Sequence, residues 1–134
     1  MSERCHHIGL FAVQPDRLID FYIKKLGFVR ESGKEVPRIL MHQVFDINSS
    51  CQLTKLRRGN AVLEIFSYPH PHQERSWDRN FSYNHWGLGV DDKEAFCLEV
   101  ENKGVSLLKI DMNGRSIIFI KDPEGNLIEI YQNE

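Results

Sequence analysis

The stretch His7-Ile8-Gly9-Leu10 returns in the middle of the chain as His85-Trp86-Gly87-Leu88. Both copies read His-x-Gly-Leu, and each opens a short apolar run of strand length, over residues 8–13 and 86–90. The two histidines lie 78 positions apart. A motif that recurs in this way indicates a duplicated module, so the sequence predicts two related halves.

A helical pattern follows each of these runs after a polar break. In the first half, apolar residues recur at close to helical spacing over residues 18–26, and Gly27 ends the pattern. In the second half the pattern covers residues 95–100, and Gly104 ends it. The two glycines lie 77 positions apart, so the registers of the halves agree within one residue.

Each half also closes on a matching strand pattern, Val62-Leu63-Glu64-Ile65-Phe66 and Leu127-Ile128-Glu129-Ile130-Tyr131. These copies lie only 65 positions apart, so the first half carries 13 extra residues, which we place within 37–50 with a short helix over 38–45. Two further strands fit in each half. We expect them at residues 28–34, 51–57, 105–110 and 115–121. Residues 57–60 and 122–126 have the composition of hairpin turns, so each half reads β-α-β-β-β.

Length and composition fit this organisation. The 134 residues are about the length of one domain, and 27% charged with 41% hydrophobic residues is ordinary globular composition. We therefore expect one domain over residues 1–134, built from modules at 5–67 and 84–132 that a linker over 68–83 joins. His70 and His72 in that linker are not expected to form a site.

Charge and cysteine content exclude several classes of protein. Seventeen Lys and Arg against nineteen Asp and Glu give a net charge of −2, which argues against a nucleic-acid binder. No apolar run approaches the ~20 residues that span a bilayer, so no membrane partner is expected. Three widely spaced cysteines form no disulfide framework and favour a reducing compartment. We expect a cytoplasmic protein.

Four residues stand at matched positions of the two halves. Alternate residues of a strand face opposite sides of its sheet, so Glu64 and Glu129 should face away from their apolar neighbours. His7 and His85 stand at the starts of the first strands, each with a glycine two positions on. Together the halves would converge two imidazoles and two carboxylates, which suit zinc, nickel, iron, cobalt or manganese better than calcium or magnesium. Any one of these residues alone is most often only solvent-facing, so the prediction rests on the repeated pairing.

The chain resembles the vicinal oxygen chelate superfamily, which includes glyoxalase I, methylmalonyl-CoA epimerase, extradiol dioxygenases and fosfomycin-resistance enzymes. The motifs that carry the resemblance are His7-Ile8-Gly9-Leu10, Phe21-Tyr22, Leu26-Gly27-Phe28, Leu63-Glu64-Ile65 and the stretches 85–92 and 119–129. The resemblance implies an α+β fold in which two βαβββ modules form a cupped mixed β-sheet around one divalent metal, with the helices on the outer face. It places His7, Glu64, His85 and Glu129 on the four metal positions. The adjacent His6 is expected to point to the opposite face, as a non-ligand.

The resemblance also implies a chemistry. In this superfamily the metal holds two neighbouring substrate oxygens and stabilises an enolate, while a carboxylate moves a proton at the adjacent carbon. The complete His-Glu-His-Glu set is most similar to glyoxalase I. The leading hypothesis is therefore a metal-dependent lyase or isomerase acting on a small 2-oxo or 2-hydroxy carbonyl compound, with Glu64 and Glu129 as proton shuttles. Phe11, Met41 and Phe45 are candidates for the substrate pocket.

Two alternatives stay open. An extradiol-type dioxygenase would use iron with His7, His85 and Glu129, and a ligand-sequestering resistance protein would bind without turnover. Glutathione-using members typically carry an arginine four residues past the first ligand histidine, where this chain has Phe11, and an apolar ring cannot pair with a carboxylate. The resemblance further implies a homodimer, with the metal site either within one chain or across the dimer interface.

Overall fold

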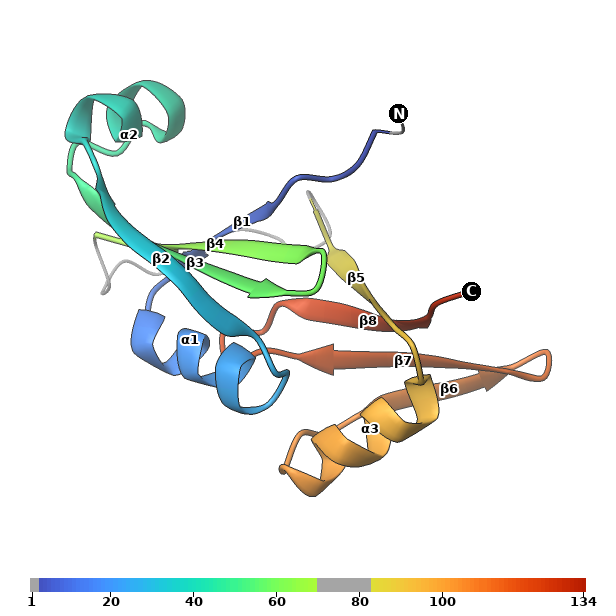
Figure 1. Cartoon of the computed structure of the whole chain (residues 1–134). Helices are drawn as coiled ribbons and strands as arrows, with labels where there is room; N and C mark the ends of the chain where they lie inside the picture. The colour runs from blue at the N-terminus through green and yellow to red at the C-terminus, as the bar shows by residue number, and fades with distance from the viewer. Residues whose placement is uncertain (1–2, 70–82) are drawn as a thin grey trace. The chain divides into compact units, whose positions relative to one another are not determined.

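A computed structural model describes residues 3–69 and 83–134, within two compact units, residues 1–74 and 75–134. The elements are β1 (Ile8–Ala12), α1 (Pro15–Lys24), β2 (Val29–Val36), α2 (Arg38–Phe45), β3 (Cys51–Arg58), β4 (Ala61–Ser67), β5 (His85–Val90), α3 (Lys93–Asn102), β6 (Leu108–Met112), β7 (Arg115–Lys121) and β8 (Leu127–Gln132). Each unit has the order βαβββ, with α2 inserted into the first (Figure 1). The predicted α+β class with two βαβββ modules is confirmed.

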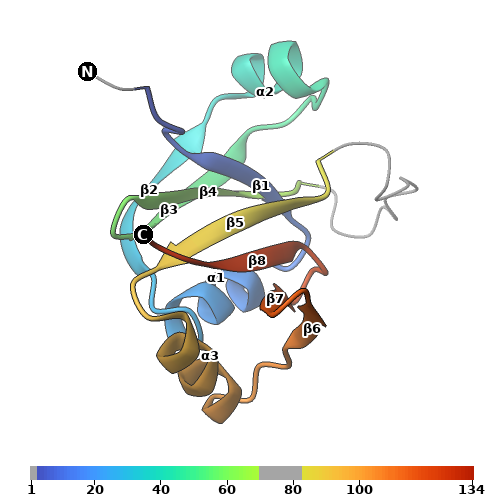
Figure 2. The ribbon, with the colours of Figure 1, turned by 90° about the vertical axis from the view of Figure 1, so that its right-hand side faces the viewer.

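The two units contain sheets of the same topology. The first sheet has the order β1-β4-β3-β2, and the second has the order β5-β8-β7-β6. In each sheet the first strand pairs in parallel with the last, while the remaining pairs are antiparallel. Figure 2 shows β5 beside β8 in the second sheet. A parallel pair needs a long connection rather than a hairpin, which the helix and two intervening strands provide in both units.

Helix α1 covers its sheet through one apolar stripe. Pro15 stands in the first turn, where its fixed φ suits a helix and its missing N–H leaves no bond unmade. Leu18 and Tyr22, one turn apart, are fully buried where the helix packs against β4. After the helix, Gly27 adopts a φ of +76°, which reverses the chain toward β2.

Helix α3 plays the same part in the second unit. Asp92 caps its start, because its carboxylate accepts a hydrogen bond from the Ala95 N–H at 3.0 Å. Phe96 and Val100 are buried on the side that packs against β8. Both helices lie along the sheet of their own unit in Figure 1.

The strand boundaries agree with the prediction within two residues except after α3. The inserted helix over 38–45 and the strand over 115–121 are confirmed at the residues expected. Strand β6 starts at Leu108 rather than at residue 105. The N–H of the buried Val105 donates to the Val100 carbonyl at 3.0 Å, so this residue closes the turn that follows α3 and is not yet in a strand.

Most of the linker predicted at 68–83, including His70 and His72, lies outside the described residues. The assembly of both modules into one domain stays a prediction. Among residues 3–69 and 83–134, no helix has the length and apolar character needed to cross a membrane.

Candidate functional site

Glu64 projects from β4 on the sheet face opposite to that of its two neighbours in the strand. Leu63 and Ile65 on either side of it are buried, as the strand alternation predicts. In the parallel pairing of β1 with β4, Gly9 lies beside Glu64. His7, two residues before Gly9, reaches the same carboxylate, and its Nε2 lies 3.5 Å from Glu64 Oε1. The first unit therefore brings together one predicted histidine and one predicted glutamate.

The second unit repeats this arrangement. Ile128 and Ile130 are buried, and Glu129 between them lies beside Gly87 in the parallel pairing of β5 with β8. His85 Nε2 lies 3.3 Å from Glu129 Oε1. A Cβ added at Gly87 would approach only the backbone oxygen of Glu129, at 4.0 Å, so the glycine leaves room above the sheet.

The separation within each pair suits two ligands of one metal ion. Ligand atoms about 2.1 Å from a metal stand about 3.0 to 3.4 Å apart for angles between a right angle and the tetrahedral one, close to the two distances found here. The side chains are 42% and 19% exposed for His7 and Glu64, and 38% and 23% exposed for His85 and Glu129. Each pair is therefore open to a ligand from solvent. Within residues 3–69 and 83–134, no group of three or more His, Cys, Asp and Glu side chains with metal-site geometry occurs.

The other ring nitrogen of each histidine is held by the residue just before it. His6 Nδ1 lies 2.9 Å from His7 Nδ1, with the two rings edge to face. In the second unit, Asn84 Oδ1 forms a hydrogen bond with His85 Nδ1. The prediction that His6 points to the opposite face is wrong, because β1 begins only at Ile8 and strand alternation does not apply before it. Asn84 was not anticipated, although it stands at the same place in the repeat as His6.

The two glutamates differ in their neighbours across the sheet. Lys55 on β3 pairs with Glu64 in the antiparallel register, whereas Phe119 on β7 pairs with Glu129. The Phe119 ring also packs edge-on against the His85 ring, with centroids 5.2 Å apart. The first pair thus has a cationic residue at the neighbouring sheet position, and the second has an apolar one.

The three predicted pocket residues gather in the first unit. The rings of Phe11 and Phe45 meet edge to face, with centroids 5.0 Å apart, and both contact Phe66. Phe66 follows Glu64 by two residues on β4, so it shares that glutamate's side of the sheet. Met41 is fully buried in the cluster against which Phe11 and Phe66 pack. An aromatic wall therefore lies on the sheet face that carries Glu64, with Met41 supporting it from the core.

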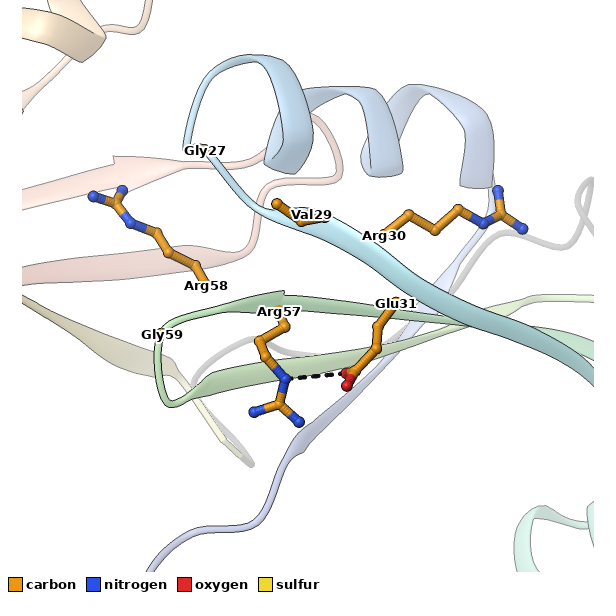
Figure 3. A pocket seen from close by; sticks show the side chains of 7 residues that line it. All are labelled: Gly27, Val29, Arg30, Glu31, Arg57, Arg58 and Gly59. Atoms are coloured by element: carbon orange, nitrogen blue, oxygen red, sulfur yellow. Dashed lines mark hydrogen bonds and ion pairs between the residues drawn. The ribbon is translucent and has the colours of Figure 1, made fainter.

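A shallow hollow of about 540 Å³ lies elsewhere in the first unit, at the β3–β4 hairpin (Figure 3). Its lining residues are Gly27, Val29, Arg30, Glu31, Arg57, Arg58 and Gly59. Arg57 Nε lies 3.1 Å from Glu31 Oε2, and Arg58 Nη1 donates to the Leu26 carbonyl at 2.7 Å. These arginines bind groups of their own unit, and none of the predicted site residues lines the hollow.

The turn before β8 is organised by one buried carboxylate. Asp122 is only 4% exposed, and its Oδ1 accepts the backbone N–H groups of Glu124 at 2.9 Å and Asn126 at 3.0 Å. Its Oδ2 accepts the side-chain amide of Asn126 at 2.8 Å. Gly125 has a φ of +82°, which the turn requires. Because β8 begins directly after this turn, Asp122 helps to place Glu129.

The two buried cysteines, Cys51 and Cys97, are poorly suited to nucleophilic chemistry. Burial raises the pKa of the Cys51 thiol and of the Cys97 thiol, so both thiols stay protonated to higher pH. Cys51 Sγ also lies 2.8 Å from the Ser67 carbonyl oxygen and donates to it. Cys5 is exposed, and all three cysteines are free thiols.

Comparison with known proteins places this geometry in a family. The chain is 27% identical to the protein YaeR of Escherichia coli (strain K12) over 133 residues, which cover 97% of this chain and 96% of YaeR. It is 23% identical to the protein YwkD of Bacillus subtilis (strain 168) over 130 residues, covering 95% and 94% of the two chains. The solved structure of the trypanothione-dependent glyoxalase I of Leishmania major superposes with a TM-score of 0.69 and 26% identity, covering 98% of this chain and 87% of that one. The family model of the Glyoxalase/Bleomycin resistance protein/Dioxygenase superfamily matches residues 4–130. The resemblance drawn from the sequence motifs is thus confirmed, and the chain belongs to this superfamily.

Proposed function

We propose that this protein is a metal-dependent lyase or isomerase of the glyoxalase type, with His7, Glu64, His85 and Glu129 as the metal ligands. One observation carries the proposal: each module brings one imidazole Nε2 within 3.3 to 3.5 Å of one carboxylate oxygen, at matched positions of the repeat. Similarity to a glyoxalase I over nearly the whole chain supports the same class of reaction. The substrate would be a small 2-oxo or 2-hydroxy carbonyl compound.

A divalent zinc, nickel, iron, cobalt or manganese ion would supply Lewis acidity for a substrate carbonyl at this site. Glu64 and Glu129 would each take up and return a proton at the carbon beside that carbonyl, because both carboxylates are partly exposed and each lies beside the histidine of its own unit. Lys55, at the sheet position beside Glu64, would favour an anionic substrate on that side.

The aromatic wall of Phe11, Phe45 and Phe66 would hold the apolar part of the substrate and keep water from the reacting carbon. Met41 would fix this wall from the core rather than touch the substrate, since it is fully buried. A substrate with a compact apolar group fits such a wall better than one with a second carboxylate at this place.

The decisive experiment measures metal content and proton exchange in protein purified without an affinity tag. We expect about one transition metal per four-ligand site. Glu64→Gln and Glu129→Gln should each lower metal affinity and reduce exchange of the substrate proton by orders of magnitude. Glu99→Gln is the matched control. Glu99 lies on the exposed side of α3, and its carboxylate pairs with Lys103, four residues further along the chain, at 3.1 Å.

A panel of hemithioacetals, 2-methylacyl thioesters and catechols would identify the reaction. Proton exchange with a thioester or hemithioacetal supports the lyase or isomerase. Oxygen uptake with a catechol, together with full activity of Glu64→Gln, would replace it with the three-ligand dioxygenase. Tight binding of a ligand with no turnover of any substrate would indicate a sequestering protein.

The proposal includes a homodimer. Strand β6 is an edge of the second sheet, and Leu108, Ile110 and Met112, which alternate along it onto one face, are between 45% and 56% exposed. An exposed apolar edge strand favours pairing with another chain, and a second copy is the partner that is always present. Sedimentation equilibrium should give twice the chain mass, and Ile110→Lys should shift it toward the monomer. A wild-type monomer at micromolar concentration would refute the dimer.

A further inference from the structure

The residue directly before each repeated histidine binds the Nδ1 of that histidine. Asn84 supplies Oδ1 to His85, and His6 supplies its own Nδ1 to His7 at 2.9 Å. In both units the opposite ring nitrogen, Nε2, is the one that faces a carboxylate, at 3.5 Å from Glu64 and 3.3 Å from Glu129. A histidine in one unit and an asparagine in the other thus orient the following imidazole ring in the same way, with Nδ1 bonded and Nε2 facing a glutamate.

This arrangement decides which nitrogen can bind a metal. A neutral imidazole carries one N–H and one lone pair, and the hydrogen bond made by one nitrogen sets the role of the other. Asn84 Oδ1 bears no hydrogen, so it pairs with His85 only when Nδ1 carries the proton. The lone pair of His85 then lies on Nε2, beside Glu129.

The first unit reaches the same result through a more adaptable partner. The Nδ1 of His6 can accept a hydrogen bond from His7 or donate one to it, depending on its own tautomer. When His6 accepts, His7 carries its proton on Nδ1 and presents the Nε2 lone pair beside Glu64. The edge-to-face contact of the two rings, with centroids 5.1 Å apart, also restricts rotation of the His7 ring.

We propose that Asn84 and His6 are positioning residues that hold His85 and His7 with Nδ1 occupied and Nε2 free for the metal. The metal part of this inference rests on the proposed function, whereas the tautomer of each ring can be observed in the metal-free protein. Outer-shell partners of metal-binding histidines typically change metal affinity by about 10- to 100-fold when they are removed.

Nitrogen-15 NMR of histidine-labelled, metal-free protein tests the tautomer at a pH where imidazole is neutral. The His85 signals, assigned by their loss in His85→Gln, should be those of the Nδ1–H tautomer. Asn84→Ala should shift them toward the Nε2–H tautomer that free imidazole side chains favour, while Asn84→Asp, which keeps an acceptor oxygen, should retain the Nδ1–H form. Asn102→Ala, at an exposed position of the same unit, is the matched control and should change nothing.

Zinc titration of the same proteins tests the consequence. Asn84→Ala should weaken zinc binding by about 10- to 100-fold, and Asn84→Asp should restore it. In the first unit His6→Ala should weaken binding, whereas His6→Asn, which copies the second unit, should keep it.

The results separate this inference from the proposed function. An Nε2–H tautomer of His85 in the wild type, or equal tautomers and zinc affinities of Asn84→Ala and wild type, would overturn the positioning role. A different result is a wild type that shows the Asn84-dependent tautomer and binds none of zinc, nickel, iron, cobalt and manganese. That result would support the positioning of the His85 ring by Asn84 and refute the metal-dependent function.

Discussion

Replacement of Asp122 by alanine is expected to lower the free energy of unfolding by about 3 kcal/mol. The substitution removes the Oδ1 that accepts the N–H groups of Glu124 and Asn126, at 2.9 and 3.0 Å, from a side chain that is 4% exposed. Each backbone donor left without a partner in such a place costs about 1 to 3 kcal/mol, and we take about 1.5 for each of the two. Unfolding entropy near 2.1 cal/mol/K per residue gives about 0.28 kcal/mol/K for 134 residues, so the melting temperature should fall by about 10 °C.

Thermal and guanidinium unfolding, followed by circular dichroism, would measure this loss. Asp111→Ala is the matched control, because Asp111 is exposed and accepts a bond from the Ser116 hydroxyl at 2.8 Å. It should cost about 0.5 kcal/mol or less. Asp122→Asn keeps Oδ1 as the acceptor for both backbone donors, so its free energy of unfolding should lie between those of Asp122→Ala and Asp111→Ala. If the losses of unfolding free energy for Asp122→Ala and Asp111→Ala differ by less than about 1 kcal/mol, the Asp122 carboxylate does not organise the turn before β8.

Four further outcomes are expected. Leu63→Ala should cost about 2 to 5 kcal/mol in guanidinium unfolding, because the side chain is fully buried. Leu98→Ala, at a residue of α3 that is 57% exposed, should lower the free energy of unfolding by about 0.5 kcal/mol or less, and equal losses for the two variants would contradict the assigned core. In the native protein, a thiol reagent should modify the exposed Cys5 rapidly, whereas Cys51 and Cys97 should react mainly after unfolding. Because burial raises the pKa of both buried thiols, the unfolded chain loses these protons first as pH rises above about 8.5, the ordinary thiol value. The two thiols should therefore lower the free energy of unfolding in that range, and a Cys51→Ala variant should show a smaller loss with pH. Removal of bound metal with a chelator should lower the unfolding free energy by about 2.7 kcal/mol relative to protein at a metal concentration of 100 times Kd, and an unchanged melting curve would count against the metal site.

Local patterns predict most elements of the fold. The 3.6-residue spacing before Gly27 and the alternation around Glu64 depend only on near neighbours in the chain, and the structure confirms both. The start of β6 was displaced because Val105 bonds back to Val100 at the end of α3. The apolar pattern of the sequence cannot reveal such a hydrogen bond, because a valine fits the pattern equally well in the turn after a helix and in a strand.

The candidate site was less predictable than the fold. Matched positions in the repeat single out His7 and His85, and strand alternation assigns the faces of the two glutamates. The expected direction of the His6 side chain is wrong because strand alternation does not extend to a residue that precedes β1, whereas its expected role as a non-ligand stays a prediction. Asn84 was missed because a hydrogen bond between adjacent side chains depends on rotamers and backbone angles that no spacing rule describes.

The sequence by itself determined that the chain holds two βαβββ modules and that each carries one histidine and one glutamate at matched places. These properties follow from motifs that the chain repeats and from apolar periods of 2 and 3.6 residues, all of which can be read along the sequence without the fold. Only the tertiary structure decided that His7 meets Glu64 and that His85 meets Glu129, because parallel pairing of the first and last strands sets a register between residues far apart in the chain. It also decided which ring nitrogen faces the carboxylate, because that choice depends on the hydrogen bond that holds the other nitrogen.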